Sequence, residues 1–170
     1  MLLILSNCQT VKLSNRQTIK PSNLANGGHV ASVTSGDFAV NGELLEELLP
    51  DAEAFTDAGG KWKFAKAANV KWAKPKKGAA LPEMYDEASG KGLFVDTTKG
   101  RTNLSGMKLT YTSKKGTFRG SFKVYALEGS GKSRKLKKYT FKVSGVVVDG
   151  KGHGTATCKK PAATWPVTVR

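Results

Sequence analysis

The sequence predicts an all-β protein, an antiparallel meander that forms a curled sheet or a small barrel. Apolar residues alternate with Lys, Thr and Ser through residues 92–170, and 19 glycines accompany few large aliphatic side chains. Alternation with a period of two means that one face of each strand is buried while the other faces water. A β-sandwich is the alternative architecture, and the 170 residues are enough for one hydrophobic core.

The first 60 residues are expected to form an N-terminal segment of short strands and one helix, packed on a main β domain of residues 61–170. The predicted strands are His29–Thr34 and Asp37–Val40, because the turn dipeptide Ser35-Gly36 separates two stretches with strand-forming residues.

The helix is predicted at residues 43–49. Four leucines in this stretch fall on one helical face, Asn41 is suited to cap the first turn, and Pro50 ends the helix. The leucines are Leu44, Leu45, Leu48 and Leu49.

The main domain begins after Gly59-Gly60 with lysines that alternate with aromatic residues. This pattern predicts strands at residues 61–66 and 69–73. Residues 74–91 are rich in Pro, Gly and charge and are expected to form a loop. The loop is long for a compact domain, so it either serves a function or contains structure that the pattern does not reveal.

The alternation is clearest after residue 106. Gly120 and Gly145 each fall in the middle of a predicted strand on its inward face, which favours a sharply bent sheet. Asp149-Gly150 is a strong hairpin signal. The predicted strands are Met107–Thr112, Thr117–Leu127, Lys138–Val148, Gly152–Cys158 and Trp165–Val169.

A resemblance covers about two thirds of the chain. The Gly-x-Phe-x-Gly-x-Phe core of residues 116–122, followed by Gly-Val-Val-Val from Gly145, resembles the C-terminal β domain of unassigned function found in large predicted surface or secreted bacterial proteins. The resemblance implies an extracellular or envelope context and carries no catalytic residues. The stretches that carry it are Gly60–Ala67, Lys108–Tyr111, Gly116–Tyr125 and Gly145–Gly150.

The net charge of +15 is unevenly distributed. Residues 21–60 hold seven acids and no Lys or Arg, whereas residues 61–170 hold 25 basic residues and six acids. The basic part predicts a polysaccharide or another polyanion as partner, or else a solvated surface that the acidic segment partly neutralises. Lys132–Lys138 is a footprint for nucleic acid, but it lacks a recognition motif, so nucleic acid is the less favoured partner.

The ligand-binding candidates are aromatic residues with lysines beside them. On a solvent-facing strand their rings can stack on sugars or bases, whereas on the buried face they are core residues. The candidates are Trp62, Trp72, Tyr85, Lys61, Lys63 and Lys71.

Glu83, Asp86 and Glu87 are the only candidates for catalysis. Paired carboxylates beside an aromatic residue are typical of a polysaccharide hydrolase, and a solvated acidic patch is the alternative. His29 and His153 are not accompanied by a nucleophile motif. The residues around His153 and Cys158 do not make a metal-ligand set, so no metal and no cofactor is expected.

The expected function is a noncatalytic binding or structural module, the C-terminal part of an exported or surface bacterial protein. The alternatives are a carbohydrate-binding module or glycoside hydrolase, and a nonspecific binder of polyanions or nucleic acid. The apolar run Met1–Leu5 is too short for a signal peptide, and no stretch reaches the about 18 apolar residues of a membrane span. Cys8 and Cys158 are expected to be free thiols, with a disulfide as the alternative. Self-association through an exposed strand edge is also expected.

Overall fold

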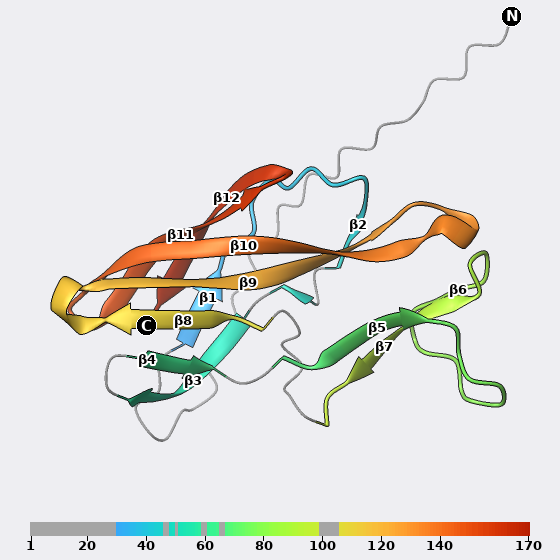
Figure 1. Ribbon diagram of the computed structural model, residues 1–170, viewed down its shortest axis with the longest axis horizontal. Helices are drawn as coiled ribbons and strands as arrows, with labels where there is room; N and C mark the ends of the chain where they lie inside the picture. Colours follow the sequence, from blue (N-terminus) through green and yellow to red (C-terminus); the bar gives the residue numbers. More distant parts are fainter. Residues whose placement is uncertain (1–29, 46–47, 50, 59–60, 65–66, 99–105) are drawn as a thin grey trace, which may run out of the picture.

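The structure is a computed structural model that describes residues 30–45, 48–49, 51–58, 61–64, 67–98 and 106–170. Two antiparallel sheets make up the fold (Figure 1). The strands are β1 (Val30–Val33), β2 (Gly42–Leu44), β3 (Asp51–Ala58), β4 (Lys61–Phe64), β5 (Asn69–Ala73), β6 (Tyr85–Asp86), β7 (Lys91–Asp96), β8 (Lys108–Thr112), β9 (Thr117–Glu128), β10 (Lys135–Val148), β11 (Lys151–Lys159) and β12 (Ala162–Val169).

The large sheet has the order β2-β9-β10-β11-β12-β1-β3-β4, and β8 pairs with the first half of β9. Strands β8 to β12 are neighbours in sequence and in space, which confirms the predicted antiparallel meander. The sheet curls into a half-barrel, as expected from the sequence. Strands β1 and β3 extend the same sheet beyond β12, so residues on both sides of position 60 share one architecture.

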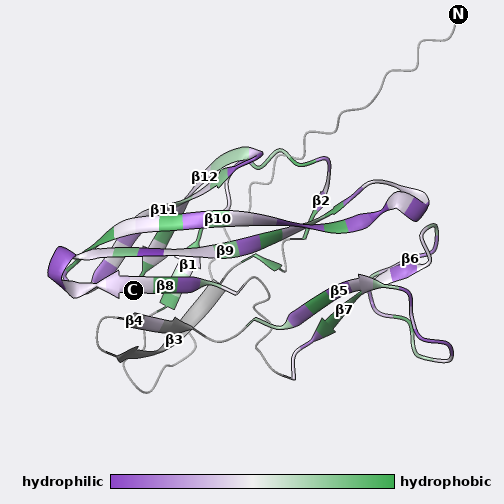
Figure 2. Ribbon diagram, viewed as in Figure 1, coloured by the Kyte–Doolittle hydropathy of each residue, from purple (hydrophilic) through white to green (hydrophobic). Residues whose placement is uncertain are grey.

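The main hydrophobic core fills the inside of the curl. Alternate residues of β9 and β10 point into it, and the polar residues between them face outward, as the alternating colours of Figure 2 show. The largest fully buried side chains of this core are Trp165, Phe118, Phe122, Phe141, Val124, Val167 and Val169. Period-two alternation therefore predicted the burial of these strands correctly.

The two ends of the curled sheet meet at a seam between β4 and β8. These strands run close together but share no ladder pairing in the part of the chain that the structure describes. The indole of Trp62 instead stacks on the ring of Tyr111, with 5.3 Å between ring centroids and 10° between planes. Among the described residues, this stack joins the two ends of the curled sheet.

Glycines allow the tight curvature. A Cβ at Gly120 would lie 1.7 Å from the carbonyl oxygen of Lys108, and one at Gly145 would lie 2.5 Å from the ring of Phe118. The ring of Phe118 thus occupies the space that a side chain at position 145 would need. The prediction that both glycines mark a sharp bend is confirmed by these close approaches.

The small sheet has the order β5-β7-β6 and lies beneath the far end of the β9–β10 hairpin (Figure 1). A second hydrophobic cluster joins the two. Tyr125, Leu127 and Leu136 of the hairpin pack there against Val70 and Leu93 of the small sheet. Both faces of the end of β9 are consequently buried, and alternation disappears over its last residues.

The predicted helix at residues 43–49 is wrong at its start. Glu43 and Leu44 lie in β2, which pairs with β9, and the amide of Leu45 continues this pairing by donating to the carbonyl of Tyr125 at 3.0 Å. Leu45 and Leu48 are buried in the second cluster. The edge of β9 offers backbone partners that an isolated short helix lacks, and the leucine spacing fits either structure.

Two other expectations about the N-terminal segment also fail. Asp37–Val40 has no strand structure, although Phe38 packs on Phe141 and Trp165 in the main core. The acidic segment that follows forms β3, which was not predicted, because Asp, Glu and Ala are poor strand formers. Strand β3 pairs with β1 on one side and with β4 on the other, and these partners stabilise it as a strand. No helix within the described residues has the length and apolarity needed to cross a membrane.

Candidate functional site

The outward side of strands β8 to β11 carries a group of polar residues, here called the outer face, while Val146 and Val148 are exposed on the same side at the end of β10. Strand pairing places its residues in rows that run across the sheet. One row contains Lys108, Ser121, Lys142 and Thr157, and the next contains Thr110, Arg119, Ser144 and Thr155. The outer face consists of these eight residues with Lys123, Thr140 and Lys159.

The outer face holds cations and hydroxyls without a carboxylate. Residues 97–170 contain 17 Lys and Arg residues and only two acids, Glu128 and Asp149. Glu128 is at the end of β9 and Asp149 is in the β10–β11 turn, so neither lies on the outer face. The charges of these lysines and of Arg119 give the outer face a positive potential.

The acidic segment lies elsewhere in the sheet. Strand β3, which carries Asp51, Glu53 and Asp57, pairs with β1, and both β1 and β12 separate it from β11. On its other side only β4 lies between β3 and β8, so the acidic strand lies two strands from the β8 edge of the outer face.

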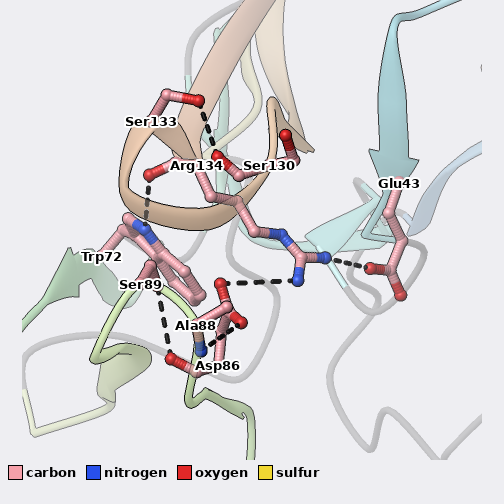
Figure 3. Close-up of polar contacts among 8 residues, drawn as sticks. All are labelled: Glu43, Trp72, Asp86, Ala88, Ser89, Ser130, Ser133 and Arg134. Carbon is pink, nitrogen blue, oxygen red and sulfur yellow. Dashed lines mark hydrogen bonds and ion pairs between the residues drawn. The ribbon is translucent and has the colours of Figure 1, made fainter.

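The described ion pairs gather instead at the far end of the β9–β10 hairpin. Arg134 reaches from the hairpin turn between two carboxylates (Figure 3), with its Nη2 2.9 Å from Glu43 Oε2 and its Nη1 3.7 Å from Asp86 Oδ2. The indole Nε1 of Trp72 donates to the carbonyl of Arg134 at 3.0 Å. These contacts fasten β2 and the small sheet to the hairpin.

Asp86 is held in its charged form by this arrangement. A hydrogen bond from Ser89 lowers the pKa of Asp86 below its usual value, and the Ala88 amide and the charge of Arg134 lower it further against the opposing effect of burial. A carboxylate of this kind is a poor general acid, because it stays ionised at neutral pH. Its role here is structural.

A second carboxylate, Glu128, is almost fully buried beneath the hairpin. Lys137 Nζ lies 2.7 Å from Glu128 Oε2, and the hydroxyl of Tyr139 donates to the other carboxylate oxygen. Burial alone would raise the pKa of Glu128, but the hydrogen bonds from Lys137 and Tyr139 outweigh it and lower the pKa. Burial and the same carboxylate raise the pKa of Tyr139.

This lowered pKa predicts a loss of stability in acid. A carboxylate whose pKa is lower in the folded state stabilises the fold above its unfolded pKa, and that contribution disappears as the pH falls through the folded value. The usual pKa of this group is 4.5. We expect the free energy of unfolding, measured by urea titration from pH 7 to pH 3, to fall less steeply in acid for Glu128→Gln than for the wild type.

Glu87→Gln is the matched control, because Glu87 is exposed. It should keep the wild-type dependence on pH. Equal acid limbs for Glu128→Gln and the wild type would show that the contacts of Glu128 do not stabilise its charge.

The structure distributes the predicted ligand-binding residues over different environments. Trp62 is only 4% exposed, and its indole packs against Tyr111 and Phe118. It is therefore a core residue, which was the alternative to a ligand-binding role. Trp72 is half-buried and its indole nitrogen is occupied by Arg134. A sugar-stacking platform made of both tryptophans is therefore absent from the outer surface of the described residues.

The remaining ligand-binding candidates do not join them. Tyr85 is half-buried in β6, and Lys71 is exposed on β5. Lys61 and Lys63 lie in β4, and their side chains fall outside the described part of the chain.

The catalytic candidates do not form a pair of available carboxylates. Glu83 and Glu87 are exposed, whereas Asp86 contacts Arg134. His153 is exposed on β11, and His29 lies outside the described residues. In the part of the chain that the structure describes, no three His, Cys, Asp or Glu side chains gather as a metal site. Cys158 is a buried free thiol, and its proposed partner Cys8 falls outside the described residues.

Sequence reasoning did not single out the cations of the outer face as a group. The signal was present, because the period that places Phe118 and Phe122 inside the sheet places Arg119 and Lys123 outside it. The pattern does not show which strands are neighbours in the sheet. It therefore does not show which cations share a row. Comparison with family models, curated proteins and solved structures finds no match for this chain.

Proposed function

We propose that this protein is a noncatalytic binding module that holds a linear acidic polysaccharide on its outer face. In this proposal it works as part of an exported or surface bacterial protein. The observation that carries the proposal is an exposed set of cations from four neighbouring strands with no carboxylate among them.

The spacing of the cations suits a polymer with repeated negative groups. Neighbouring strands lie about 4.8 Å apart, so Lys108 and Lys142, two strands apart in one row, start about 10 Å from each other. Arg119 and Lys123 are four residues apart on β9, about 13 Å along the strand. A chain of charged sugars laid on the outer face would meet cations about 10 to 13 Å apart.

The chemistry of the face favours a sugar over a nucleic acid. Proteins that bind single strands without sequence preference stack bases on aromatic rings, and no Trp, Tyr or Phe is exposed on the outer face. Threonine and serine hydroxyls stand between the cations instead. They can donate to and accept from sugar hydroxyls, while Lys and Arg bind the acidic groups.

Charge removal on the face tests the proposal. We expect the triple variant Lys108→Gln/Arg119→Gln/Lys123→Gln to bind heparin fragments or polygalacturonate at least about tenfold more weakly than the wild type, because three ionic contacts are lost. Affinity is measured by isothermal titration calorimetry, after circular dichroism has shown that the variant is folded. Wild-type affinity in this variant would overturn the proposal.

The matched control removes three charges elsewhere. Lys74→Gln/Lys76→Gln/Lys77→Gln alters an exposed loop of the small sheet and should stay within about threefold of the wild type. Wild-type affinity should also fall by roughly 50-fold between about 50 and 200 mM salt if about four ionic contacts form. Tighter binding to single-stranded DNA than to both polysaccharides would assign the face to nucleic acid. Binding to neutral dextran that ignores salt would contradict an ionic face.

A further inference from the structure

The outer face contains a notch where β10 and β11 separate. The pairing of these strands runs from Val148 opposite Lys151 to Lys142 opposite Thr157. Beyond that point β10 continues toward Lys135 paired with β9 alone, while the end of β11 stays with β12 and turns back after Lys159. Between the two diverging strands lies a depression of about 280 Å³.

Lysines surround the notch. Its lining includes Lys138, Lys142, Lys159 and Lys160, with the hydroxyl-bearing Thr140 and Thr157, and no acidic residue. Lys138 lies where β10 pairs with β9 alone, Lys142 lies where β10 also pairs with β11, and Lys159 and Lys160 lie at the end of β11 and in the turn after it. Their convergence follows from the strand separation and is not a run of charge in the sequence.

The charges in the notch are not compensated by the protein. None of the four lysines takes part in an ion pair with a described residue, since Lys137 and Arg134 take the carboxylates at the hairpin end. Lys138 Nζ also lies 5.9 Å from the ring centroid of Tyr125, on the β9 side of β10. A concave site lined by one sign of charge concentrates the field more than a flat surface does.

We propose that the notch seats one anionic group of the bound polymer, a sulfate or a carboxylate, and so anchors the chain on the outer face. Lysine ammonium groups bind the anion from opposite sides, and the Thr140 hydroxyl donates to one of its oxygens. The anchor rests on the proposed function and deepens it, because it assigns most of the affinity to one end of the face.

Two pairs of adjacent lysines make a matched test. Lys159→Gln/Lys160→Gln removes two charges from the notch at the β11–β12 turn, and Lys114→Gln/Lys115→Gln removes two from the exposed β8–β9 turn. With heparin hexasaccharide as the probe, we expect the notch variant to lose about tenfold or more in affinity and the control to lose less than about threefold.

The outcomes separate the anchor from the proposed function. Equal losses in the two variants, together with a large loss in Lys108→Gln/Arg119→Gln/Lys123→Gln, would overturn the anchor and leave the acidic-polysaccharide module standing. Failure of the wild type to bind any acidic polymer would overturn both.

Amide chemical shifts give a second measurement that does not depend on a variant. Titration of the wild type with a sulfated disaccharide and, separately, with galacturonate should shift the amides of Thr140, Lys142 and Lys159 first. The amides of Lys114 and Lys151, at the opposite end of the sheet, should move little. Uniform shifts at all exposed lysines would show that anions bind without preference for the notch and would contradict the anchor. The stronger of the two probes identifies the anionic group.

Discussion

Gly120→Val should destabilise the fold by about 3 kcal/mol or more, which is the upper end of the range for overpacked cores. The first atom of any side chain at this position would lie 1.7 Å from the carbonyl oxygen of Lys108 and 2.6 Å from a methyl carbon of Leu109. Backbone cannot yield as the end of a flexible side chain does. Strand β8 would have to leave its place beside β9, and the stack of Tyr111 on Trp62 would be lost with it.

Urea denaturation followed by tryptophan fluorescence measures this effect. The loss is easily detected, because domains of this size have total free energies of unfolding of about 5–15 kcal/mol. Gly36→Ala is the control. A Cβ there makes only an ordinary contact of 3.4 Å with Trp165, so the midpoint should hardly move. A Gly120→Val protein with the wild-type midpoint would mean that β8 does not lie against β9 as described.

Trp165→Ala should cost about 3–5 kcal/mol, the usual loss for a large aromatic side chain removed from a core. Trp165 is completely buried and lies at the centre of an aromatic cluster. Its ring centroid is 4.2 Å from that of Phe141 and 5.4 Å from that of Phe38. The cavity would separate β12 from β10 and from the segment that carries Phe38, so three parts of the chain would lose contacts at once.

The same denaturation experiment compares Trp165→Ala with Val148→Ala. Val148 is 56% exposed on the outward side of β10, and its truncation should change the free energy of unfolding by no more than about 0.5 kcal/mol. Trp165→Phe should fall between the two, because a smaller ring keeps part of the stacking. Similar midpoints for Trp165→Ala and Val148→Ala would contradict the central place of this indole.

The strands that the sequence predicted well are those whose side-chain pattern has a single explanation. In the middle of β9 and β10 the inward residues Phe118, Phe122, Phe141 and Val143 are large and apolar, while the residues between them are mostly Lys, Arg or Ser. Only an extended chain with one buried face satisfies this pattern. The bends at Gly120 and Gly145 could be predicted for the same reason, because an inward position without a side chain needs a close neighbour.

The elements that were missed depend on contacts far away in the sequence. The leucines of residues 44–49 fit a helix or a strand, and the free edge of β9, more than 70 residues later, decides for β2 at the start of this stretch. The composition of β3 opposes a strand, and only β1 and β4 supply its hydrogen bonds. The outer face and its notch depend on the strand order and on the point where β11 separates from β10. The local hydrophobic period predicts neither the strand order nor this point.

The stacked rings of Trp62 and Tyr111 have a consequence for how the molecule opens. Pulling β4 away from β8 exposes aromatic surface but, among the described strands, breaks no ladder between them, whereas parting β9 from β10 breaks a ladder of twelve residue pairs. Local opening of the sheet should therefore begin between β4 and β8. In hydrogen–deuterium exchange the amides of β8 should acquire deuterium well before those in the middle of β10, and the opened half-barrel would unroll from that side.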